Sequence, residues 1–248
     1  MTAEIGAASH VGPVAAVWFD LFGTLVDMAD LGDACESVAT GRGVALADRW
    51  RARQLEATWL RTVMGAWIDF ETVTRDALDV ALMDLGLDGG PAPDAARVEL
   101  ATAFERLPAQ PEAKPVLDRL RAAGLQLGVL SNGSAGMIER TVTNAGLADH
   151  LDTFRTVDAV RRYKPDPAVY GLTVDATGLP ASQIGFVTAN GWDAAGASAF
   201  GLRVVWLRPG PSVFLPAVGA PPPIVATWLD LPAIFGASSA PDASSPSG

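Results

Sequence analysis

The stretch that decides the fold reads Val17-Trp18-Phe19-Asp20-Leu21-Phe22-Gly23-Thr24-Leu25-Val26-Asp27. An apolar run that begins at Val14 ends abruptly at the carboxylate of Asp20, which a glycine and a threonine follow. A buried strand of a parallel sheet has this pattern and delivers the side chain at its end to the edge of the sheet. Asp20 is therefore a candidate nucleophile. Because Asp, Gly and Thr are also common turn residues, this stretch alone leaves open that Asp20 only begins a turn.

Composition limits the classes of protein to consider. The chain has 248 residues, 49% of them hydrophobic, which suits one large domain or a core with a smaller inserted domain. The formal charge of −10 would repel a phosphate backbone, so we expect no nucleic-acid partner, although a local basic pocket for a small anion remains open. Cys35 is the only cysteine, which excludes an internal disulfide. With neither a signal-like start nor an apolar run near 18 residues, we expect a soluble cytoplasmic protein without a membrane partner.

The chain divides by composition and periodicity. Residues 1–12 and 236–248 are small and polar, and we expect flexible tails there. Residues 28–107 show helical spacing and no convincing strand, with a first apolar series and a second one between Val73 and Leu85. The first series consists of Leu46, Trp50, Ala57, Leu60 and Met64. We interpret residues 28–107 as an all-helical cap domain, inserted where a lid over a strand-end site would lie.

Short strands alternate with helices after Pro111. We predict strands at 125–130, 152–156, 184–187 and 203–207, and helices at 114–123, 135–145 and 166–177. A further helix is predicted to follow Asp193 and to end at Phe200. This alternation predicts an α/β fold, a doubly wound Rossmann-like parallel sheet, with the helical cap inserted. The core domain would comprise residues 13–27 and 108–235, and the Pro-rich residues 209–223 would form an irregular surface connection.

Polar side chains follow the predicted strands at their carboxyl ends. They are Asp20 with Thr24, Ser131 with Asn132, Lys164, and Asn190 with Asp193. Ligands of such sheets bind in the crevice outside the carboxyl ends of the strands, so these groups are expected to converge. Their convergence favours a functional role for Asp20 over a simple turn. Neither His10 nor His150 lies in a motif, so no histidine-based triad is predicted.

The strand-end residues also resemble those of a known superfamily. Asp20-x-Phe22-Gly23-Thr24-Leu25, Leu130-Ser131-Asn132-Gly133, Tyr163-Lys164-Pro165-Asp166 and the final acid resemble the four motifs of the haloacid dehalogenase superfamily. The resemblance spans about Val14 to Phe235. Most members are phosphatases, which carry an aspartate as leaving-group acid where this chain has Phe22, and near-adjacent acids for Mg²⁺ where this chain has one. We therefore expect no metal and no cofactor.

Within the superfamily, the chain is most similar to the L-2-haloacid dehalogenase (type II) branch. The pattern Thr188-x-Asn190-x-Trp192-Asp193 resembles that branch's Ser-x-Asn-x-aromatic-Asp. Trp50-Arg51 is followed by Gln54-Leu55-Glu56-Ala57-Thr58-Trp59-Leu60-Arg61, which matches the branch's cap, and Tyr170 occupies its tyrosine position. The resemblance implies a hydrolase of carbon–halide bonds that forms a homodimer.

The implied mechanism assigns a role to each site residue. Asp20 would attack the α-carbon of an L-2-haloacid with inversion, and water would hydrolyse the aspartyl ester to release a D-2-hydroxyacid. Lys164 would keep Asp20 ionised, and Asp193 would partner Lys164 and position the water. Thr24, Tyr170, Thr188 and Asn190 would give polar support.

A further group of residues would bind the substrate. Ser131 and the amides after it would form an anion nest for the substrate carboxylate, and Asn132 and Arg51 would hold the halide. Wall candidates are Leu21, Phe22, Leu55, Phe70 and Trp192. Simpler roles remain open: Lys164, Ser131 and Asp193 could cap helices, Arg51 could lie on a solvated helix face, and the wall residues could be core.

Departures from the branch leave the substrate range open. Phe22 stands where tyrosine is usual, Ala52 where glutamine is common, and Thr188 where serine is usual. An alternative substrate is a strained ring such as azetidine-2-carboxylate, opened through the same ester. The same fold could also serve a Mg²⁺-dependent phosphatase or a non-catalytic binding protein.

Overall fold

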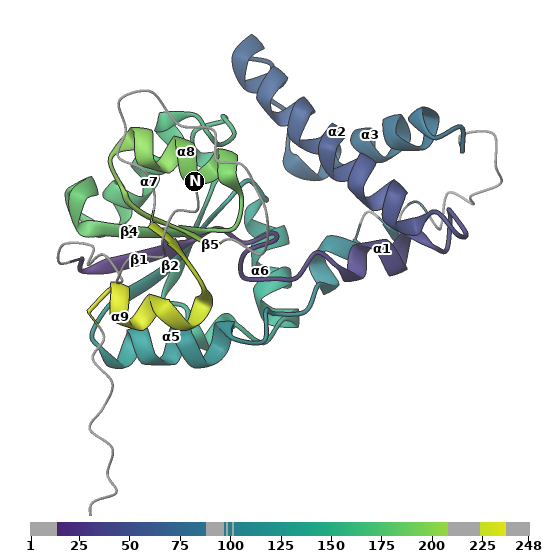
Figure 1. The fold of residues 1–248 in the computed structure, drawn as a ribbon. Helices are drawn as coiled ribbons and strands as arrows, with labels where there is room; N and C mark the ends of the chain where they lie inside the picture. The colour runs from purple at the N-terminus through teal and green to yellow at the C-terminus, as the bar shows by residue number, and fades with distance from the viewer. Residues whose placement is uncertain (1–13, 88–96, 98, 101, 208–223, 237–248) are drawn as a thin grey trace, which may run out of the picture.

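The sheet stands at the centre of the computed structural model, which describes residues 14–87, 97, 99–100, 102–207 and 224–236 (Figure 1). Its strands are β1 (Ala16–Phe19), β2 (Gln126–Ser131), β3 (Thr153–Thr156), β4 (Ile184–Thr188), β5 (Arg203–Leu207) and β6 (Ile224–Ala226). They lie in the order β3-β2-β1-β4-β5-β6, and every pairing is parallel. The predicted doubly wound α/β sheet is confirmed.

Strand β1 lies between β2 and β4, and this central place explains its unbroken apolar sequence. All four of its residues are buried. Phe19 is in register with Val129 on one side and Val187 on the other. Asp20 therefore emerges from the middle of the carboxyl edge, between the ends of two neighbouring strands.

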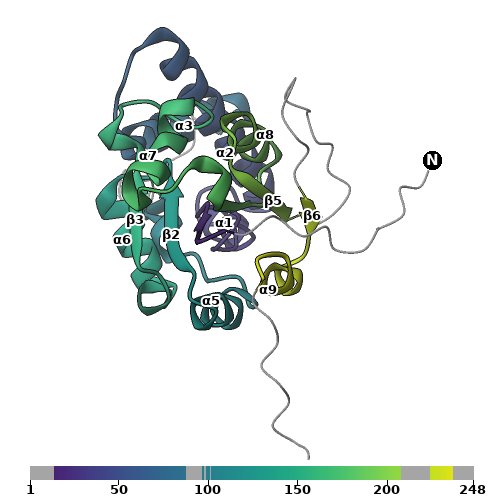
Figure 2. The ribbon, with the colours of Figure 1, turned by 90° about the vertical axis from the view of Figure 1, so that its left-hand side faces the viewer.

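Helices cover both faces of the sheet. Helices α7 (Pro167–Thr177) and α8 (Gly191–Phe200) pack together on one face. Helices α5 (Ala113–Ala122) and α9 (Leu231–Ile234) lie side by side on the other (Figures 1 and 2). Helix α6 (Ala135–Asn144) connects β2 to β3, and the 3₁₀ segments are 103–106, 148–150, 157–159, 181–183 and 228–230. No helix among the described residues is long and apolar enough to cross a membrane.

Between β1 and α5, the described residues form helices joined by turns and loops, with isolated β-bridges at Phe22, Val26 and Ala109. This segment contains α1 (Asp30–Cys35), α2 (Gly43–Met64) and α3 (Phe70–Asp84), and the last two pack against each other and project away from the sheet (Figure 1). Helix α3 begins after Asp69, whose carboxylate accepts the Thr72 N–H. The segment's two ends are joined, because the Asp27 N–H donates to the Pro108 carbonyl at 2.8 Å.

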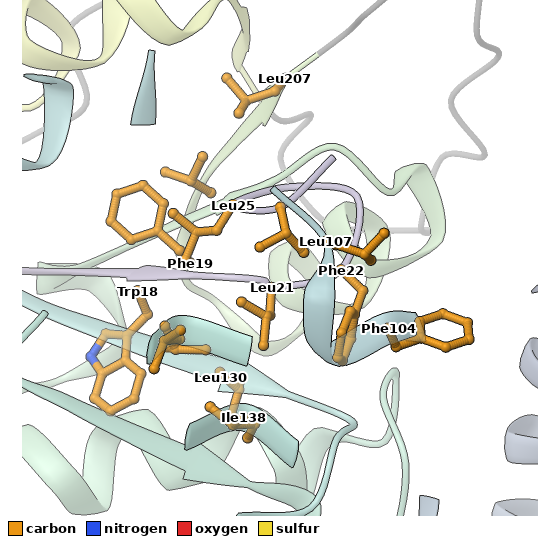
Figure 3. Packing of buried hydrophobic residues seen from close by; sticks show 14 of the residues in the cluster. Trp18, Phe19, Leu21, Phe22, Leu25, Phe104, Leu107, Leu130, Ile138 and Leu207 are labelled. Atoms are coloured by element: carbon orange, nitrogen blue, oxygen red, sulfur yellow. The ribbon is translucent and has the colours of Figure 1, made fainter. Parts of the chain in front are cut away.

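A continuous apolar cluster connects the sheet with this helical segment. Phe104 and Leu107 come from its end, and they lie near the side chains of the turn after β1 (Figure 3). Trp18 packs so closely on Gly128 that a Cβ there would lie 2.7 Å from the indole ring. Burial of each large apolar side chain contributes about 1.5–3 kcal/mol to stability.

The structure corrects the predicted apolar face of α2. Leu60 and Met64 are 53% and 65% exposed. The buried face instead runs from Trp50 to Gln54 and Thr58, in steps of four residues. Polar side chains are stable on that face because they find local partners, so apolar periodicity could not reveal it.

Other differences concern short elements and the ends of the chain. Strand β6 and helix α9 were not expected from the sequence. Elements of three and four residues are too short to show a hydrophobic period. The predicted surface connection at 209–223 and the predicted tails, apart from Gly236, fall outside the described residues.

Candidate active site

Asp20 receives hydrogen bonds from distant parts of the chain. Its Oδ1 accepts from Lys164 Nζ at 3.1 Å, and its Oδ2 accepts from Asn190 Nδ2 at 2.7 Å and Thr24 Oγ1 at 3.0 Å. The side chain is only 6% exposed. Hydrogen bonds and a cation at this distance favour the ionised carboxylate. A residue that merely began a turn would not be held in this way.

The turn after Asp20 is closed by its own backbone. The Leu21 carbonyl accepts the N–H groups of Thr24, Leu25 and Val26. Gly23 adopts φ +81°, a conformation that residues with a Cβ rarely adopt. The Thr24 hydroxyl donates to Asp20 and accepts the Ala189 N–H at 2.9 Å, so it joins the ends of β1 and β4.

Lys164 lies between two carboxylates. Its Nζ is 2.9 Å from Asp193 Oδ2 and 3.1 Å from Asp20 Oδ1, and the residue is 1% exposed. Burial opposes its charge, but the charges of Asp193 and Asp20 outweigh burial and raise the pKa of Lys164 above its usual value. The surface-lysine alternative does not fit this burial. The Lys164 N–H also donates to Asn132 Oδ1 at 3.0 Å, which ties the ends of β2 and the lysine segment together.

Asp193 is fully buried in the first turn of α8. Asn190 is the N-cap of that helix, so the capping alternative for Asp193 is wrong. The Asp193 Oδ1 accepts from the Tyr170 hydroxyl at 2.7 Å. Burial, reinforced by the Asp20 charge and opposed by Lys164, raises the pKa of Asp193 to about 6. Burial and the Asp193 charge raise the pKa of Tyr170 well above its usual value, so Tyr170 stays a donor.

The loop after β2 contributes Ser131 and Asn132, which are both buried. The Ser131 Oγ accepts the Gly133 N–H at 3.1 Å, so that amide of the predicted anion nest already has a partner. Helix α6 is capped by Ser134, not by Ser131. At the end of β4, the buried Thr188 Oγ1 accepts the Asn190 N–H at 3.0 Å and holds the turn that presents Asn190 to Asp20.

Arg51 reaches the site from α2. Its Nη1 donates to Gln54 Oε1 at 2.6 Å. Burial lowers the pKa of Arg51, and the nearby charges of Asp20 and Asp193 oppose this effect. An arginine keeps its charge under such conditions, so the guanidinium is a cation on which the charges of both carboxylates act.

The apolar wall candidates separate into two groups. Phe22 packs on Phe70 with ring centroids 6.3 Å apart, and on Phe104 edge-to-face at 5.7 Å. Trp192 contacts Trp59 of α2 at 5.8 Å, and Leu55 is half-buried on that helix. The side chains of Leu21, Phe22 and Phe70 all lie in the buried core cluster, which fits the core-packing alternative for these three (Figure 3 labels Leu21 and Phe22).

Comparisons with known proteins agree with this geometry. The family model of haloacid dehalogenase-like hydrolases matches residues 14–201. The (S)-2-haloacid dehalogenase of Pseudomonas putida is 40% identical over 195 residues, which cover 79% of this chain and 85% of that protein. The chain belongs to the haloacid dehalogenase-like hydrolase family. The resemblance predicted from the motifs is thereby confirmed.

Solved structures of family members superpose closely. The L-2-haloacid dehalogenase of Xanthobacter autotrophicus with chloropropionic acid covalently bound has a TM-score of 0.82 and 34% identity, and the match covers 90% of this chain and 98% of that one. Another L-2-haloacid dehalogenase has a TM-score of 0.85 and 38% identity, with 90% and 99% covered.

The site differs from that of a metal-dependent member of the family. The Lys164 ammonium fills the space between the two carboxylates. Within the described ranges, no group of three or more His, Cys, Asp or Glu side chains comes together. Phe22 is packed among phenyl rings and offers no proton to a leaving group. Each oxygen of Asp20 and Asp193 accepts a hydrogen bond from Lys164, Thr24, Asn190 or Tyr170, so the carboxylates as they are held do not suit Mg²⁺.

Two buried polar residues behind Arg51, Gln54 and Thr74, had no role predicted from the sequence. Gln54 Nε2 donates to Thr74 Oγ1 at 2.7 Å, and the Thr74 hydroxyl donates to the Phe70 carbonyl at 2.7 Å. A usable signal was present, because residues three apart on a helix lie on one face. Gln54 follows Arg51 at that spacing.

Proposed function

We propose that this family member hydrolyses L-2-haloacids to D-2-hydroxyacids through an ester on Asp20, with inversion at the α-carbon. The observation that carries the proposal is the pairing of an aspartate bound to Lys164, Thr24 and Asn190 with a phenylalanine at the acid position. Halide departs as an anion and needs no proton. The set of residues therefore fits displacement at carbon and lacks a group that phosphate transfer requires.

In the first step an Asp20 oxygen would attack the α-carbon, and the carbon–halogen bond would break with its electron pair going to the halide. Arg51 would stabilise the halide through its charge, with Asn132 as a further donor. Ser131 would bind the substrate carboxylate. Phe22 and Phe70, which pack together, would form part of an apolar wall that keeps water from the departing halide.

In the second step water would attack the aspartyl carbonyl carbon, and the bond from that carbon to the substrate oxygen would break. One proton of the water would go to the departing D-2-hydroxyacid hydroxyl and the other to solvent, which restores the Asp20 carboxylate. Thr24, Asn190 and Lys164, which donate to the Asp20 oxygens, would stabilise the charge that develops there. Asp193 would position the water and hold Lys164, while Tyr170 holds Asp193. Thr188 would act through the turn that presents Asn190.

Isotope labelling tests the ester directly. One turnover with L-2-chloropropionate in H₂¹⁸O, with excess EDTA present, should place ¹⁸O in Asp20 and release chloride. The Asp20→Asn variant is the control and should neither release halide nor gain label. Label only in the hydroxyacid would show direct attack by water. Absence of halide release from L-2-chloropropionate and from monohaloacetates would contradict the whole proposal.

We propose that residues 28–107 act as a cap over a core made of residues 13–27 and 108–235. The support is that the two ends of the segment are joined at Asp27 and Pro108, and that α2 brings Arg51 to the carboxylates. The cap also contacts the lysine segment, because the Tyr163 N–H donates to Thr62 Oγ1 at 3.0 Å.

We propose further that the protein forms a homodimer through the second half of α2. Leu60, Val63 and Met64 are 53%, 86% and 65% exposed, and such a cluster of apolar side chains marks an interface. Val63→Glu should convert a dimer to a monomer in light scattering. Val44→Glu, at the opposite end of α2 and 66% exposed, is the control. A wild-type monomer would contradict the proposal.

A cytoplasmic location is a proposal of the same kind. It is supported by the single cysteine, Cys35, which is buried and has its pKa raised to about 12 by burial and the neighbouring Glu36. Such a thiol has little reactivity and suits a reducing compartment. Fractionation of the source cells would test this.

A further inference from the structure

We propose that Gln54 is a positioning residue, which holds the Arg51 guanidinium at the site as a neutral partner and so accelerates departure of the halide. The inference rests on the proposed function and goes beyond it, since it concerns a residue that touches neither Asp20 nor its hydrogen-bond donors. Gln54 and Thr74, the residues behind Arg51, are 0% and 1% exposed.

The hydrogen bonds behind Arg51 run in one direction. The Phe70 carbonyl can only accept, so the Thr74 hydroxyl must donate its single proton to it at 2.7 Å. The Thr74 oxygen can then only accept, and this forces the Gln54 amide nitrogen toward Thr74 at 2.7 Å. The Gln54 carbonyl oxygen is left facing Arg51 Nη1 at 2.6 Å. A backbone carbonyl on α3 thus determines which end of the amide meets the guanidinium.

A neutral acceptor leaves the charge of Arg51 free for the site. A carboxylate at position 54 would also accept from Nη1, but its negative charge would compete with the halide for the guanidinium. It would also require the Thr74 hydroxyl to turn away from the Phe70 carbonyl, since a carboxylate cannot donate. The charges of Asp20 and Asp193 already act on Arg51, and a third negative charge beside it at the buried position 54 would weaken the field on the leaving group.

Fixing the guanidinium before the reaction is what makes it effective. A long arginine side chain loses rotamer entropy when it is held in one orientation. A donor that is already oriented toward developing charge costs no reorganisation during the step. Gln54 supplies this orientation from within the same helix, one turn from Arg51.

The test compares leaving groups in single-turnover halide release. For Gln54→Leu, the rate with L-2-chloropropionate should fall on the order of 10²-fold, as when one preorganised donor is lost. The rate with L-2-bromopropionate should fall less, because bromide is the better leaving group and depends less on the cation. The ratio of the bromide release rate to the chloride release rate should therefore be larger in Gln54→Leu than in the wild-type protein.

Two further variants separate positioning from packing. Thr74→Val removes the hydroxyl that links Gln54 to the Phe70 carbonyl and leaves Arg51 itself unchanged. It should raise the ratio of bromide to chloride release rates as Gln54→Leu does. Thr74→Ser keeps the hydroxyl and should give the wild-type ratio. The matched control is Thr58→Val, one turn further along the same buried face, whose hydroxyl donates only to the Leu55 carbonyl in the helix. It should lower stability without changing the ratio.

A further variant tests the effect of a negative charge at position 54. Gln54→Glu keeps an acceptor oxygen for Nη1, and we expect chloride release to slow at least as much as in Gln54→Leu. If Gln54→Glu releases chloride at the wild-type rate, the requirement for a neutral partner is overturned.

Each outcome decides the positioning role. An unchanged ratio in Gln54→Leu and Thr74→Val, or an equal change in Thr58→Val, would overturn it. If Gln54→Leu does not fold, Thr74→Val and Thr74→Ser carry the test. Failure of the wild-type protein to release halide from either substrate would contradict the proposed function instead.

Discussion

Lys164 is held by two carboxylates inside the protein, and its removal would leave both of them without a cation. Lys164→Met should abolish halide release, because Asp20 would lose the cation that lies 3.1 Å from its Oδ1. Breaking a buried ion pair by removing one partner also costs about 3–5 kcal/mol of unfolding free energy. Halide release and thermal unfolding would measure both effects. Lys114→Met, at an exposed position, is the control, and retained activity in Lys164→Met would refute the assignment.

Asp193 makes activity depend on pH in the mildly acidic range. Its pKa is raised to about 6, mainly by burial, so protonation below that pH removes the charge opposite Lys164. The single-turnover rate should therefore rise with pH through about 6. Asp193→Asn should lose most activity, and the remaining rate should no longer rise with pH through about 6. A flat profile in the wild-type enzyme between about pH 5 and 7 would show that Asp193 does not control the step.

The same shift has the opposite sign for stability. A carboxyl whose pKa is higher in the folded protein than in the unfolded chain binds its proton more tightly when folded. Its contribution is complete below the unfolded pKa of about 3.9 and is lost as the pH rises through the folded value. Ionised Asp193 therefore costs stability at neutral pH, while it serves the chemistry.

Residue roles could be predicted from sequence where a polar side chain ends a strand. Asp20, Lys164 and Asn190 were placed correctly at the carboxyl edge, since parallel strands bring their ends together. The Gln54 and Thr74 pair was not, because a polar residue on a buried helix face breaks the apolar pattern. Only the partners in space show why it is there.

At the scale of elements, the contact between α7 and α8 supports the site. A Cβ on Gly196 would lie 2.6 Å from the Tyr170 hydroxyl and 2.5 Å from Pro165 Cβ. Gly196→Ala should push α7 and α8 apart, disturb the Tyr170–Asp193 hydrogen bond, and cost about 1–3 kcal/mol of stability. Calorimetry and halide release would measure the effect.

A matched glycine-to-alanine variant on the neighbouring helix separates the effect of steric crowding from the effect of helix propensity. Gly171 in α7 has open space, since a Cβ added there would meet its nearest neighbour, the Phe200 ring, at 4.0 Å. Gly171→Ala should therefore stabilise the protein by about 0.4–1 kcal/mol. Equal effects of the two substitutions would contradict the close-packing argument.

Elements were predictable in proportion to their length and burial. The strands β1 to β5 and the helices between them follow clear hydrophobic runs and periods. Helix α2 was expected, but its apolar residues Leu60 and Met64 are exposed, since what they contact is outside the single chain or is solvent. Local pattern cannot distinguish an exposed apolar residue from a core residue.

At the scale of the whole molecule, the helical segment and the sheet meet at Tyr163. Its hydroxyl donates to the Ile68 carbonyl at 2.7 Å, and its ring stacks on Trp67 with centroids 4.8 Å apart. Burial, reinforced by nearby acidic groups, raises the pKa of Tyr163 further above neutrality, so this donor does not ionise under ordinary conditions. The residue directly precedes Lys164, and the position of the helices is thereby connected to the Lys164 ammonium.

Tyr163→Phe tests this connection between the two parts. Removal of the hydroxyl leaves the Ile68 carbonyl without this donor, at a cost of about 1–3 kcal/mol in unfolding free energy. The halide-release rate should fall several-fold because Lys164 loses part of its support. Unfolding in urea and single-turnover kinetics would report the two effects. A stability loss with an unchanged rate would show that the contact holds the fold without affecting Lys164.

The central place of β1 has a consequence for the order of events during synthesis. Ala16 pairs with Gln126 and Ile184, both more than one hundred residues later in the chain. The most apolar strand therefore leaves the ribosome long before either neighbour exists, while α2 and α3, which contact each other over a short separation, can associate early. Until β2 has been translated, β1 has no partner strand, and until β4 has been translated one edge of β1 stays open. Chaperones and aggregation compete for the nascent chain during this interval.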